Sequence, residues 1–363
     1  MRNTGAVIST GDDRTDGMLE SLRPPPGWTA AVPDEATAAA LTTLLRAHEQ
    51  QARGWAGSGE DDVLVEVGAK GALVRENVVL RDPDGTVRGW ASAHDRAAGR
   101  MLLSVVVDPA LDDETSDAVA EVLFTWAVGA AVRVGRTRGL EVQQIDTGAF
   151  ADDTRQHRWL ERAGYDRVRT WWQMSRPVAP GDEDLAPEPD RGVLIRPVMR
   201  QGGGMPDEDD LRTVHDILEA AFADHFNSHE ESFDEFVFRL REDPGHRWDH
   251  WWIAEIVDDG SEPVPAGTLV GTMSPGGVDE HGVPQPDGSY VSYLGVLQTA
   301  RGRGVAKALL NMIIADAASR GRDRVGLEVD ADSPTGADGL YLSMGWRTKY
   351  VTESWHLDVP VPR

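Results

Sequence analysis

The stretch YVSYLGVLQTARGRGVAKALL, residues 290–310, decides the fold of the second half of this chain. Its apolar beginning, residues 290–297, predicts a buried strand, and the segment from Arg301 onward predicts a helix with apolar residues at helical spacing. The first backbone amides of a helix have no carbonyl partner, and the helix dipole favours negative charge beside them. Because Gly302 and Gly304 let a ligand approach these amides closely, the stretch predicts an anion-binding turn.

Two interpretations of this turn follow from general motifs. A dinucleotide-binding fingerprint, G-x-G-x-x-G, begins at Gly302 and Gly304, although Lys307 stands where that fingerprint has its third glycine. On this interpretation Glu328, at the end of the next predicted strand, is the acid that binds the ribose. On the other interpretation the two glycines only make a tight turn between a strand and a helix.

A third interpretation rests on a resemblance to a known family. The pattern Arg301-x-x-Gly304-x-Ala306, preceded by Leu294-Gly295-Val296, resembles the pyrophosphate loop of the GNAT acetyltransferases. The resemblance implies that this strand splays from its neighbour and that its free backbone groups pair with the pantetheine of acetyl-CoA. It also implies that the amides of the loop hold the pyrophosphate. The predicted loop residues are Arg301, Gly302, Arg303, Gly304, Val305, Ala306 and Lys307.

A second resemblance lies downstream, where LEVDADSPTGADGLYLSMGW is similar to the later GNAT segment, a strand followed by D-x-N-x-x-A-x-x-L-Y-x-x-x-G-F. Tyr341 falls on the tyrosine, Gly345 on the glycine and Trp346 on the aromatic residue, while Ser333 replaces the asparagine. The resemblance implies that Tyr341 protonates the departing CoA thiolate. A phenol with a pKa of about 10 can donate to a thiolate whose conjugate acid titrates at about 8.5. Alternatively, Tyr341 only packs its ring in the core.

The two halves of the chain predict the same order of elements, on either side of the proline- and acid-rich stretch VAPGDEDLAPEPD. The segment WLERAGYDRVRTWWQM lines up with LYLSMGWRTKYVTESWHL, with Gly164 and Gly345 as anchors. The resemblance implies an α/β (α+β) protein with tandem GNAT-like domains, each a mixed, mostly antiparallel sheet flanked by helices. We expect a disordered tail (1–23), a degenerate GNAT-like domain (24–178), a linker (179–191) and a GNAT domain with the acetyl-CoA site (192–363).

The tandem arrangement resembles that of mycothiol synthase and its actinobacterial relatives, although this chain has Tyr290 where the mycothiol enzyme carries an acidic residue. The first half departs further from the family pattern. Its counterpart of the loop, residues 108–116, reads DPALDDETS, and its three consecutive acids would repel a pyrophosphate. Leu160, at the position of Tyr341, cannot donate a proton. We therefore expect the first half to bind no CoA in the usual way, and either to shape the substrate cleft or to stabilise the second half.

The acceptor of the amine proton has several candidates. An amine must be neutral to attack a thioester, so a general base assists the reaction. Glu328 lies on the strand beside the loop strand, Asp287 and His281 precede the loop strand, and His225 follows the first helix of the second half. Each of these is otherwise an ordinary solvated or hydrogen-bonded side chain. A nearby aromatic group either lines a pocket or enters the core: Trp248, Trp251 and Trp252.

The composition is that of a soluble globular protein, with 40% hydrophobic and 27% charged residues among 363. The chain has no cysteine, which excludes disulfides, thiolate nucleophiles and cysteine metal sites, and we predict no metal site. A net charge of −25 disfavours binding to nucleic acid and favours a cationic or amine-bearing substrate. No apolar run approaches the roughly 20 residues of a membrane span, and no secretory signal is present, so we expect a cytoplasmic protein.

These observations together predict an acetyl-CoA-dependent N-acetyltransferase, in which the primary amine of a small molecule attacks the thioester directly. The main alternative is a non-catalytic protein that binds or senses acyl-CoA. A dinucleotide-dependent oxidoreductase is a third hypothesis. We expect a monomer or a homodimer, and the sequence does not identify the acetyl acceptor.

Overall fold

The structure is a computed structural model that describes most of the chain. The described residues are 19, 21–96, 100–185, 192–200, 204–223, 231–242, 246–258, 262–277, 283–332 and 336–362. Three residues considered above, His225, His281 and Ser333, lie outside the described residues, as does nearly all of the predicted N-terminal tail.

Within the described residues, each half of the chain contains six strands and four α-helices in the same order. The first half contains β1 (Thr29–Ala31), α2 (Ala38–Arg53), α3 (Glu60–Val67), β2 (Arg75–Arg81), β3 (Val87–Arg96), β4 (Arg100–Val107), α4 (Asp113–Arg138), β5 (Val142–Phe150), α5 (Thr154–Arg162) and β6 (Asp166–Pro177). The second half contains β7 (Val193–Pro197), α6 (Glu208–Phe222), α7 (Phe233–Glu242), β8 (His246–Ile256), β9 (Val264–Ser274), β10 (Gly288–Val296), α8 (Val305–Ser319), β11 (Arg324–Asp330), α9 (Ala337–Ser343) and β12 (Arg347–Pro360). The internal repeat predicted from the sequence is therefore present in the structure.

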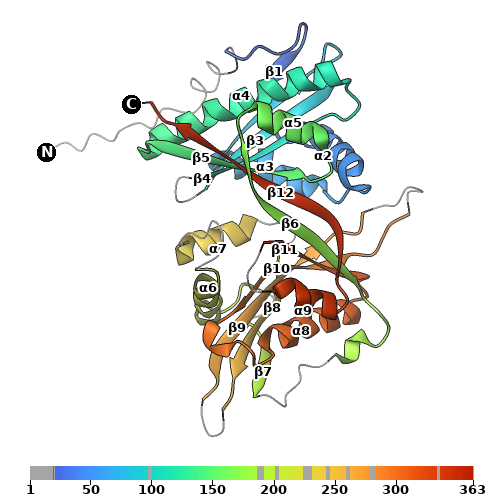
Figure 1. Ribbon diagram of the computed structural model, residues 1–363, viewed down its shortest axis with the longest axis vertical. Coiled ribbons are helices and arrows are strands. Elements are labelled where there is room, and N and C mark those ends of the chain that lie inside the picture. The colour runs from blue at the N-terminus through green and yellow to red at the C-terminus, as the bar shows by residue number, and fades with distance from the viewer. Residues whose placement is uncertain are drawn as a thin grey trace, which may run out of the picture.

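The two halves exchange their last strands and so share one 12-stranded sheet, in the order β1-β2-β3-β4-β5-β12-β6-β11-β10-β9-β8-β7. In Figure 1, β6 and β12 run as long ribbons from one half into the other. The exchange places β12 beside β5, with His356 opposite Asp146, and β6 beside β11, with Gln173 opposite Glu328. Each half therefore completes its sheet with a strand of the other half, because an unpaired central strand would leave its backbone groups without partners.

Helices cover both faces of the sheet in each half. In the first half, neighbouring strand residues alternate between two cores: Val78 packs with α4, and Val79 packs with α2 and α3. In the second half, Trp252 packs with α8 and α9, and Trp251 packs with α6 and α7. This alternation is the two-residue period of a strand that is buried on both sides. The sequence-based expectation that at least one of the tryptophans enters the core is confirmed.

The sheet opens at one place in each half. The parallel pairing of β10 with β11 covers only Ser289 to Val291, and an irregularity in β10 between Val291 and Tyr293 follows at once. The parallel pairing of β4 with β5 likewise ends at Leu103. Beyond these points β10 and β4 pair only with their other neighbour, β9 and β3. The splayed strand that the family resemblance implies is thus present in both halves.

Helix α4 is the one helix, within the described part of the chain, that is long and apolar enough to cross a membrane. Ala120, Leu123 and Ala127 of this helix are fully buried against the sheet, and 56% of its most apolar stretch is buried inside the protein. We interpret α4 as the central core helix of the first half, because burial of this kind accounts for its hydrophobicity.

The strand predicted over residues 290–297 corresponds to β10, and the helix predicted from Arg301 onward corresponds to α8, which begins at Val305. Helix α7 begins with a capping box, in which the Glu235 amide donates to Ser232 Oγ at 3.3 Å. Helix α3 was not predicted, because the sequence EDDVLVEV is short and its apolar residues also fit a strand. The strand exchange was not predicted either.

Candidate active site

The loop between β10 and α8 has the backbone conformation that its glycines allow. Gly302 has φ 79° and Gly304 has φ 83°, the left-handed region in which residues with side chains are strained. Gly304 is the N-cap of α8, and no side chain described in the structure caps this end of the helix. Ala300 and Val305 on either side are buried and anchor the loop. The amino end of α8 therefore presents uncapped amides, which is the arrangement that binds phosphates.

The three basic residues of the loop differ in their surroundings. Arg301 and Lys307 are exposed. Arg303 instead donates from Nη2 to Asp258 Oδ1 at 2.7 Å, and this contact raises the pKa of its guanidinium. Because Asp258 follows β8, the ion pair draws Arg303 toward that side of the loop. Of the predicted basic residues, Arg301 and Lys307 are thus the two exposed to a ligand.

The strand before the loop leaves one edge open. Leu294, Gly295 and Val296 pair with β9, opposite Leu269, Thr268 and Gly267, and have no partner in β11. Thus, the backbone edge that faces β11 is available to a ligand that lies between the two strands. This opening leads directly to the amino end of α8.

Tyr341 lies in α9, within the same hydrophobic cluster as Val305 at the start of α8. Its side chain is 9% exposed, and its ring contacts Trp346 edge-on with centroids 6.1 Å apart. Burial raises the pKa of Tyr341 to about 12, so the phenol is protonated at neutral pH. The aromatic contact with Trp346 supports the alternative packing interpretation, but packing of the ring still leaves the hydroxyl able to donate.

Glu328 lies on the sheet face opposite to α8. Its neighbours Leu327 and Val329 point into the α8 core, so its own side chain points to the other face. The carboxylate accepts a hydrogen bond from Gln173 of β6, and Gln173 also donates to Thr352 Oγ1 of β12 at 3.1 Å. The residue is exposed by surface area. Desolvation by the surrounding protein nevertheless raises the pKa of its carboxyl group, while the hydrogen bond from Gln173 lowers that pKa.

Two tyrosines lie on the same face as Glu328. Burial, together with the charges of Glu328 and Tyr350, raises the pKa of Tyr290. The Tyr350 hydroxyl accepts a hydrogen bond at 3.0 Å from Nη1 of Arg53, which ends α2 of the first half. Trp55, 41% exposed, packs edge-on against Tyr350 with centroids 5.3 Å apart. Residues of both halves therefore surround Glu328, which the linear sequence did not predict.

The remaining base candidates are less suited to proton transfer. Asp287 lies before β10, and its Oδ1 accepts a hydrogen bond at 3.0 Å from the Gly276 amide, so it closes the loop at that point. Trp248, which the sequence suggested as a pocket or core residue, lies against Trp251 with ring centroids 5.2 Å apart. It packs against the core between α6, α7 and the sheet. Glu328 is thus the candidate that the structure places on an exposed sheet surface beside the opening of β10 and β11.

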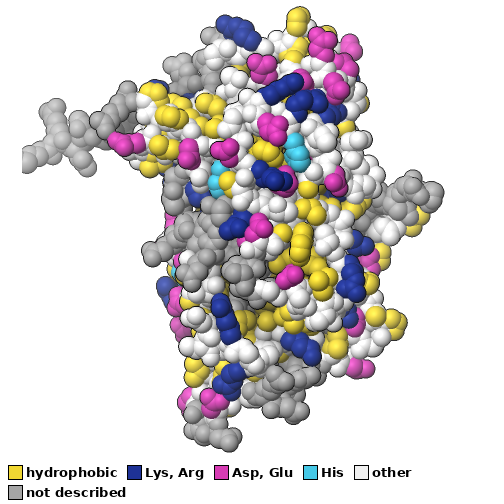
Figure 2. All heavy atoms as spheres, viewed as in Figure 1, with side chains coloured by type: hydrophobic (Ala, Val, Ile, Leu, Met, Phe, Trp, Pro, Cys, Tyr) yellow, Lys and Arg dark blue, Asp and Glu magenta, His cyan; other side chains and the backbone are white. Residues whose placement is uncertain are grey.

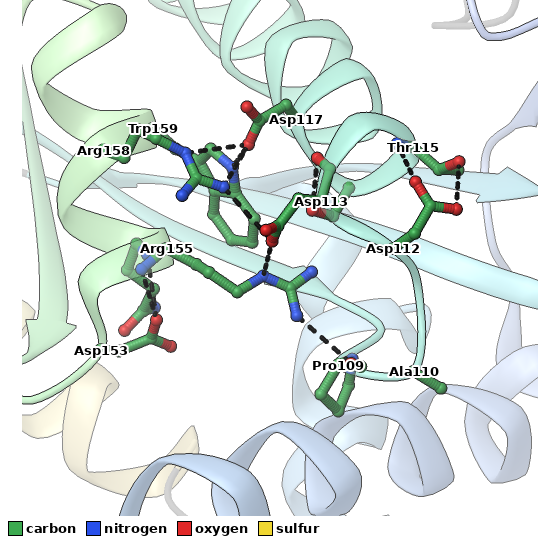
Figure 3. Close-up of polar contacts among 12 residues, drawn as sticks. Pro109, Ala110, Asp112, Asp113, Thr115, Asp117, Asp153, Arg155, Arg158 and Trp159 are labelled. Atoms are coloured by element: carbon green, nitrogen blue, oxygen red, sulfur yellow. Dashed lines mark hydrogen bonds and ion pairs between the residues drawn. The ribbon is translucent and has the colours of Figure 1, made fainter.

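The corresponding loop of the first half is closed by its own side chains (Figure 3). Asp112 caps α4 by accepting a hydrogen bond from the Thr115 amide at 2.9 Å, so a carboxylate occupies the amino end of this helix. Asp117, one turn further on, accepts hydrogen bonds at 2.7 Å from Arg158 and from the indole of Trp159, both in α5. Arg155 donates to the carbonyl of Pro109 at 3.2 Å. These contacts take the place that a pyrophosphate would need.

The face of the molecule drawn in Figure 2 has no large patch of side chains with the same charge. On the face drawn in Figure 2, arginine and lysine side chains lie among aspartates and glutamates over both halves. Positive and negative side chains are thus mixed on this face. The local charges of a site, rather than the net charge, decide what binds there.

Comparisons with known proteins find relatives that share sequence or fold with this chain. Residues 211–346, which contain β10, α8, β11 and Tyr341, match the sequence model of the acetyltransferase (GNAT) family. This segment is thus similar to the domain that defines that family. The mycothiol acetyltransferase of Frankia casuarinae is 29% identical over 244 residues, which is 64% of this chain. The chain spans the same share, 64%, of the length of that curated relative.

Two solved structures resemble nearly the whole chain. A GCN5-related N-acetyltransferase from Sphaerobacter thermophilus superimposes with a TM-score of 0.67 and 24% identity, over 94% of this chain and 98% of that one. A tandem GNAT protein from the clavulanic acid biosynthesis pathway also gives a TM-score of 0.67, with 13% identity, over 93% of this chain and 100% of that one. The predicted fold, two tandem GNAT-like units with mostly antiparallel strands, is therefore confirmed.

Proposed function

We propose that this protein transfers the acetyl group of acetyl-CoA to the primary amine of a small molecule. The observation that carries the proposal is the uncapped, glycine-led amino end of α8 next to the open edge of β10. In this proposal the amides of residues 302–307, with Arg301 and Lys307, hold the pyrophosphate, and Leu294 to Val296 pair with the pantetheine. The loop residues include Val305 and Ala306, which contribute through their backbone amides.

Glu328 is our candidate for the general base and Tyr341 for the general acid. A neutral amine nitrogen attacks the thioester carbon directly, forming the C–N bond as the C–S bond breaks. The proton lost by the amine goes to Glu328, directly or through a water, and the proton on Tyr341 goes to the CoA thiolate. A raised pKa favours Glu328 in this role, because a base titrating nearer to neutral pH holds a proton more firmly.

The structure argues against the dinucleotide-dependent alternative. Dinucleotides bind at the carboxyl ends of parallel strands, whereas β11 is parallel to β10 over three residue pairs only and antiparallel to β6. Glu328 also lies on the sheet face away from α8 and bonds to Gln173, which is not where an acid could hold a ribose next to this helix. A sensor that binds acyl-CoA without turnover stays the alternative, and catalysis separates it from an enzyme. The proposal includes a monomeric or homodimeric protein in the cytoplasm.

The first half itself suggests a sharp test. In the variant Gly304→Asp a carboxylate stands at the start of α8, as Asp112 stands at the start of α4. Gly304→Asn is its matched control, because asparagine and aspartate have the same shape and tolerate a positive φ similarly. Acetyl-CoA binding, measured by calorimetry, should be about tenfold weaker in the aspartate than in the asparagine variant. NADPH should bind to neither. Equal acetyl-CoA affinity in the two variants would contradict the proposed loop.

Catalysis needs a separate measurement. Wild-type protein, acetyl-CoA and a panel of small primary amines should release CoA thiol, and acetylated amine should form in equal amount. Binding of acetyl-CoA without thiol release for any amine tested supports the sensor instead. The calorimetric titration of the Gly304 variants measures only acetyl-CoA binding. If no amine in the panel is acetylated, the assignment of the acetyl-CoA loop therefore still stands, and only the proposed acetyl transfer is rejected.

A further inference from the structure

The first half contains a polar cavity at the place where its sheet opens. The cavity has a volume of about 410 Å³ and lies between β4 and β5, beside β12. Its polar lining includes Glu66 of α3, His94 of β3, Arg100 and Ser104 of β4, Asp146 of β5 and His356 of β12. Cavities of roughly 300 to 1,000 Å³ are typical of small-molecule sites. The cavity is separate from the loop and from Tyr341, which belong to the second half.

This cavity occupies the place that the Glu328 surface occupies in the second half. Asp146 lies opposite His356 in the sheet, as Glu328 lies opposite Gln173. In each half, a carboxylate of the fifth strand thus contacts a polar residue of a strand that comes from the other half. The helix start next to the cavity is capped by Asp112, however, so the first half combines an acceptor-like pocket with a closed phosphate loop.

The charged groups of the cavity are already paired within the protein. Arg100 Nε donates to Asp146 Oδ2 at 2.6 Å, and the other oxygen of Asp146 lies 3.0 Å from His356 Nε2. Glu66 forms an ion pair with Arg75 at 3.3 Å. Two carboxylates therefore face two guanidiniums. A ligand with a net charge would bring one charge into this cavity without a partner, and the lost hydration of that charge would weaken its binding.

Neutral groups are the ones left to bind a ligand. Among the described residues, no hydrogen bond engages the Ser104 hydroxyl or the His94 imidazole, and Ser354 Oγ only accepts, from the Trp171 indole at 2.7 Å. Burial and the charges of Arg75 and Arg96 lower the pKa of His94 to about 3, so its imidazole is neutral at physiological pH. The Ser104 hydroxyl and the neutral His94 imidazole can each donate and accept a hydrogen bond, as the hydroxyl groups of a ligand can.

We propose that the first half binds a neutral, hydroxyl-rich small molecule of about monosaccharide size in the cavity between β4 and β5. The Ser104 hydroxyl and the His94 imidazole exchange hydrogen bonds with the hydroxyl groups of the ligand, while the Arg100–Asp146 and Arg75–Glu66 ion pairs stay intact. Leu102 and Leu103 provide the apolar part of the wall, which suits the C–H face of a sugar ring. The proposal concerns a second site and does not depend on the acetyl-transfer function.

A charge-matched series of hexoses tests the chemistry of the ligand. The full-length protein is titrated by calorimetry with three neutral sugars, D-glucose, D-galactose and D-mannose, with cationic D-glucosamine and with anionic D-glucuronate. At least one neutral sugar should bind, and more tightly than both charged sugars. If none of the neutral sugars binds, or if either charged sugar binds more tightly than all three, the proposal is wrong.

Variants of the lining locate the binding. Leu102→Trp fills the cavity from a side chain that is already 39% exposed, and it should abolish binding of the neutral sugar. Leu194→Trp, at a strand residue of the second half that is 47% exposed, is the matched control and should bind normally. Ser104→Ala, a smaller change, should weaken binding about fivefold. Acetyl-CoA affinity should be unchanged in all three variants. Unaltered sugar binding in both Leu102→Trp and Ser104→Ala would overturn the proposal.

Discussion

Gln173, in the last strand of the first half, donates a hydrogen bond to Glu328, in the fifth strand of the second half. The two residues are 155 positions apart in the chain and lie directly opposite each other in the sheet. The contact exists because β6 leaves the first half and completes the sheet of the second. Gln173 belongs to the first half, whose phosphate loop is closed. It nevertheless lowers the pKa of Glu328, the carboxyl group that we propose as the catalytic base.

This contact predicts a shift in the pH dependence of the reaction. A general base works only when deprotonated, so activity falls as the pH drops through the raised pKa of Glu328. Gln173 lowers that pKa by stabilising the charged form, so Gln173→Leu should move the acid limb of the kcat profile to higher pH. Glu328→Gln should lower kcat by about 100-fold, remove the limb and leave acetyl-CoA affinity unchanged. An unshifted limb in Gln173→Leu would show that Gln173 has only a structural role.

Tyr341→Phe tests the proposed general acid. The variant keeps the ring that packs against Trp346 but loses the hydroxyl, so kcat should fall by roughly 100-fold with little change in acetyl-CoA affinity. Because the pKa of Tyr341 is about 12, its deprotonation should produce no alkaline limb in the wild-type profile below that pH. Tyr165→Phe, at a buried tyrosine of the first half, is the control and should retain full activity. A normal rate in Tyr341→Phe would remove this residue from the mechanism.

Acid should destabilise the first half through His94. The folded protein lowers the pKa of this imidazole to about 3, whereas in the unfolded chain it is about 6.5. Below about pH 6.5 the unfolded chain therefore binds the additional proton, and stability is lost as the pH falls toward the folded pKa. Between pH 7 and pH 5 this amounts to about 2 kcal/mol in the free energy of unfolding.

Urea unfolding at these two pH values measures the effect. His94→Gln should show a loss of stability on acidification that is smaller by about this amount, while Ser104→Ala, on the neighbouring strand β4, should behave like the wild type. The same slope in His94→Gln and in the wild type would mean that another group takes up the proton.

The strand exchange predicts that the halves stay together when the chain is cut. If a specific protease site is inserted between residues 186 and 191 and then cleaved, β6 and β12 remain paired with strands of the opposite half. The two fragments should co-elute in gel filtration as one particle. Residues 1–185 expressed alone should aggregate, because β5 and β6 lose β12 and expose unpaired edges in the centre of the sheet. Separation of the cleaved fragments without denaturant would contradict the exchanged topology.

Local features of the structure follow from the sequence with good accuracy. The turn after β10 depends on Gly302 and Gly304, and positive φ values at glycines are a property of the residues themselves. The capping box at Ser232 is equally local, since it involves two residues three positions apart. Helix α3 was missed because a short apolar segment does not distinguish a helix from a strand until its partners are known.

The sequence by itself determined the order of the elements apart from α3, the uncapped start of α8 and the acid-capped start of α4, because these depend on periodicity, glycine conformation and helix-end charge within a few residues. Only the tertiary structure decided which strands pair across the halves, that Gln173 faces Glu328 and His356 faces Asp146, and that Asp258 engages Arg303. Pairing and register join residues far apart in the chain, and no local pattern encodes which distant edge a strand completes.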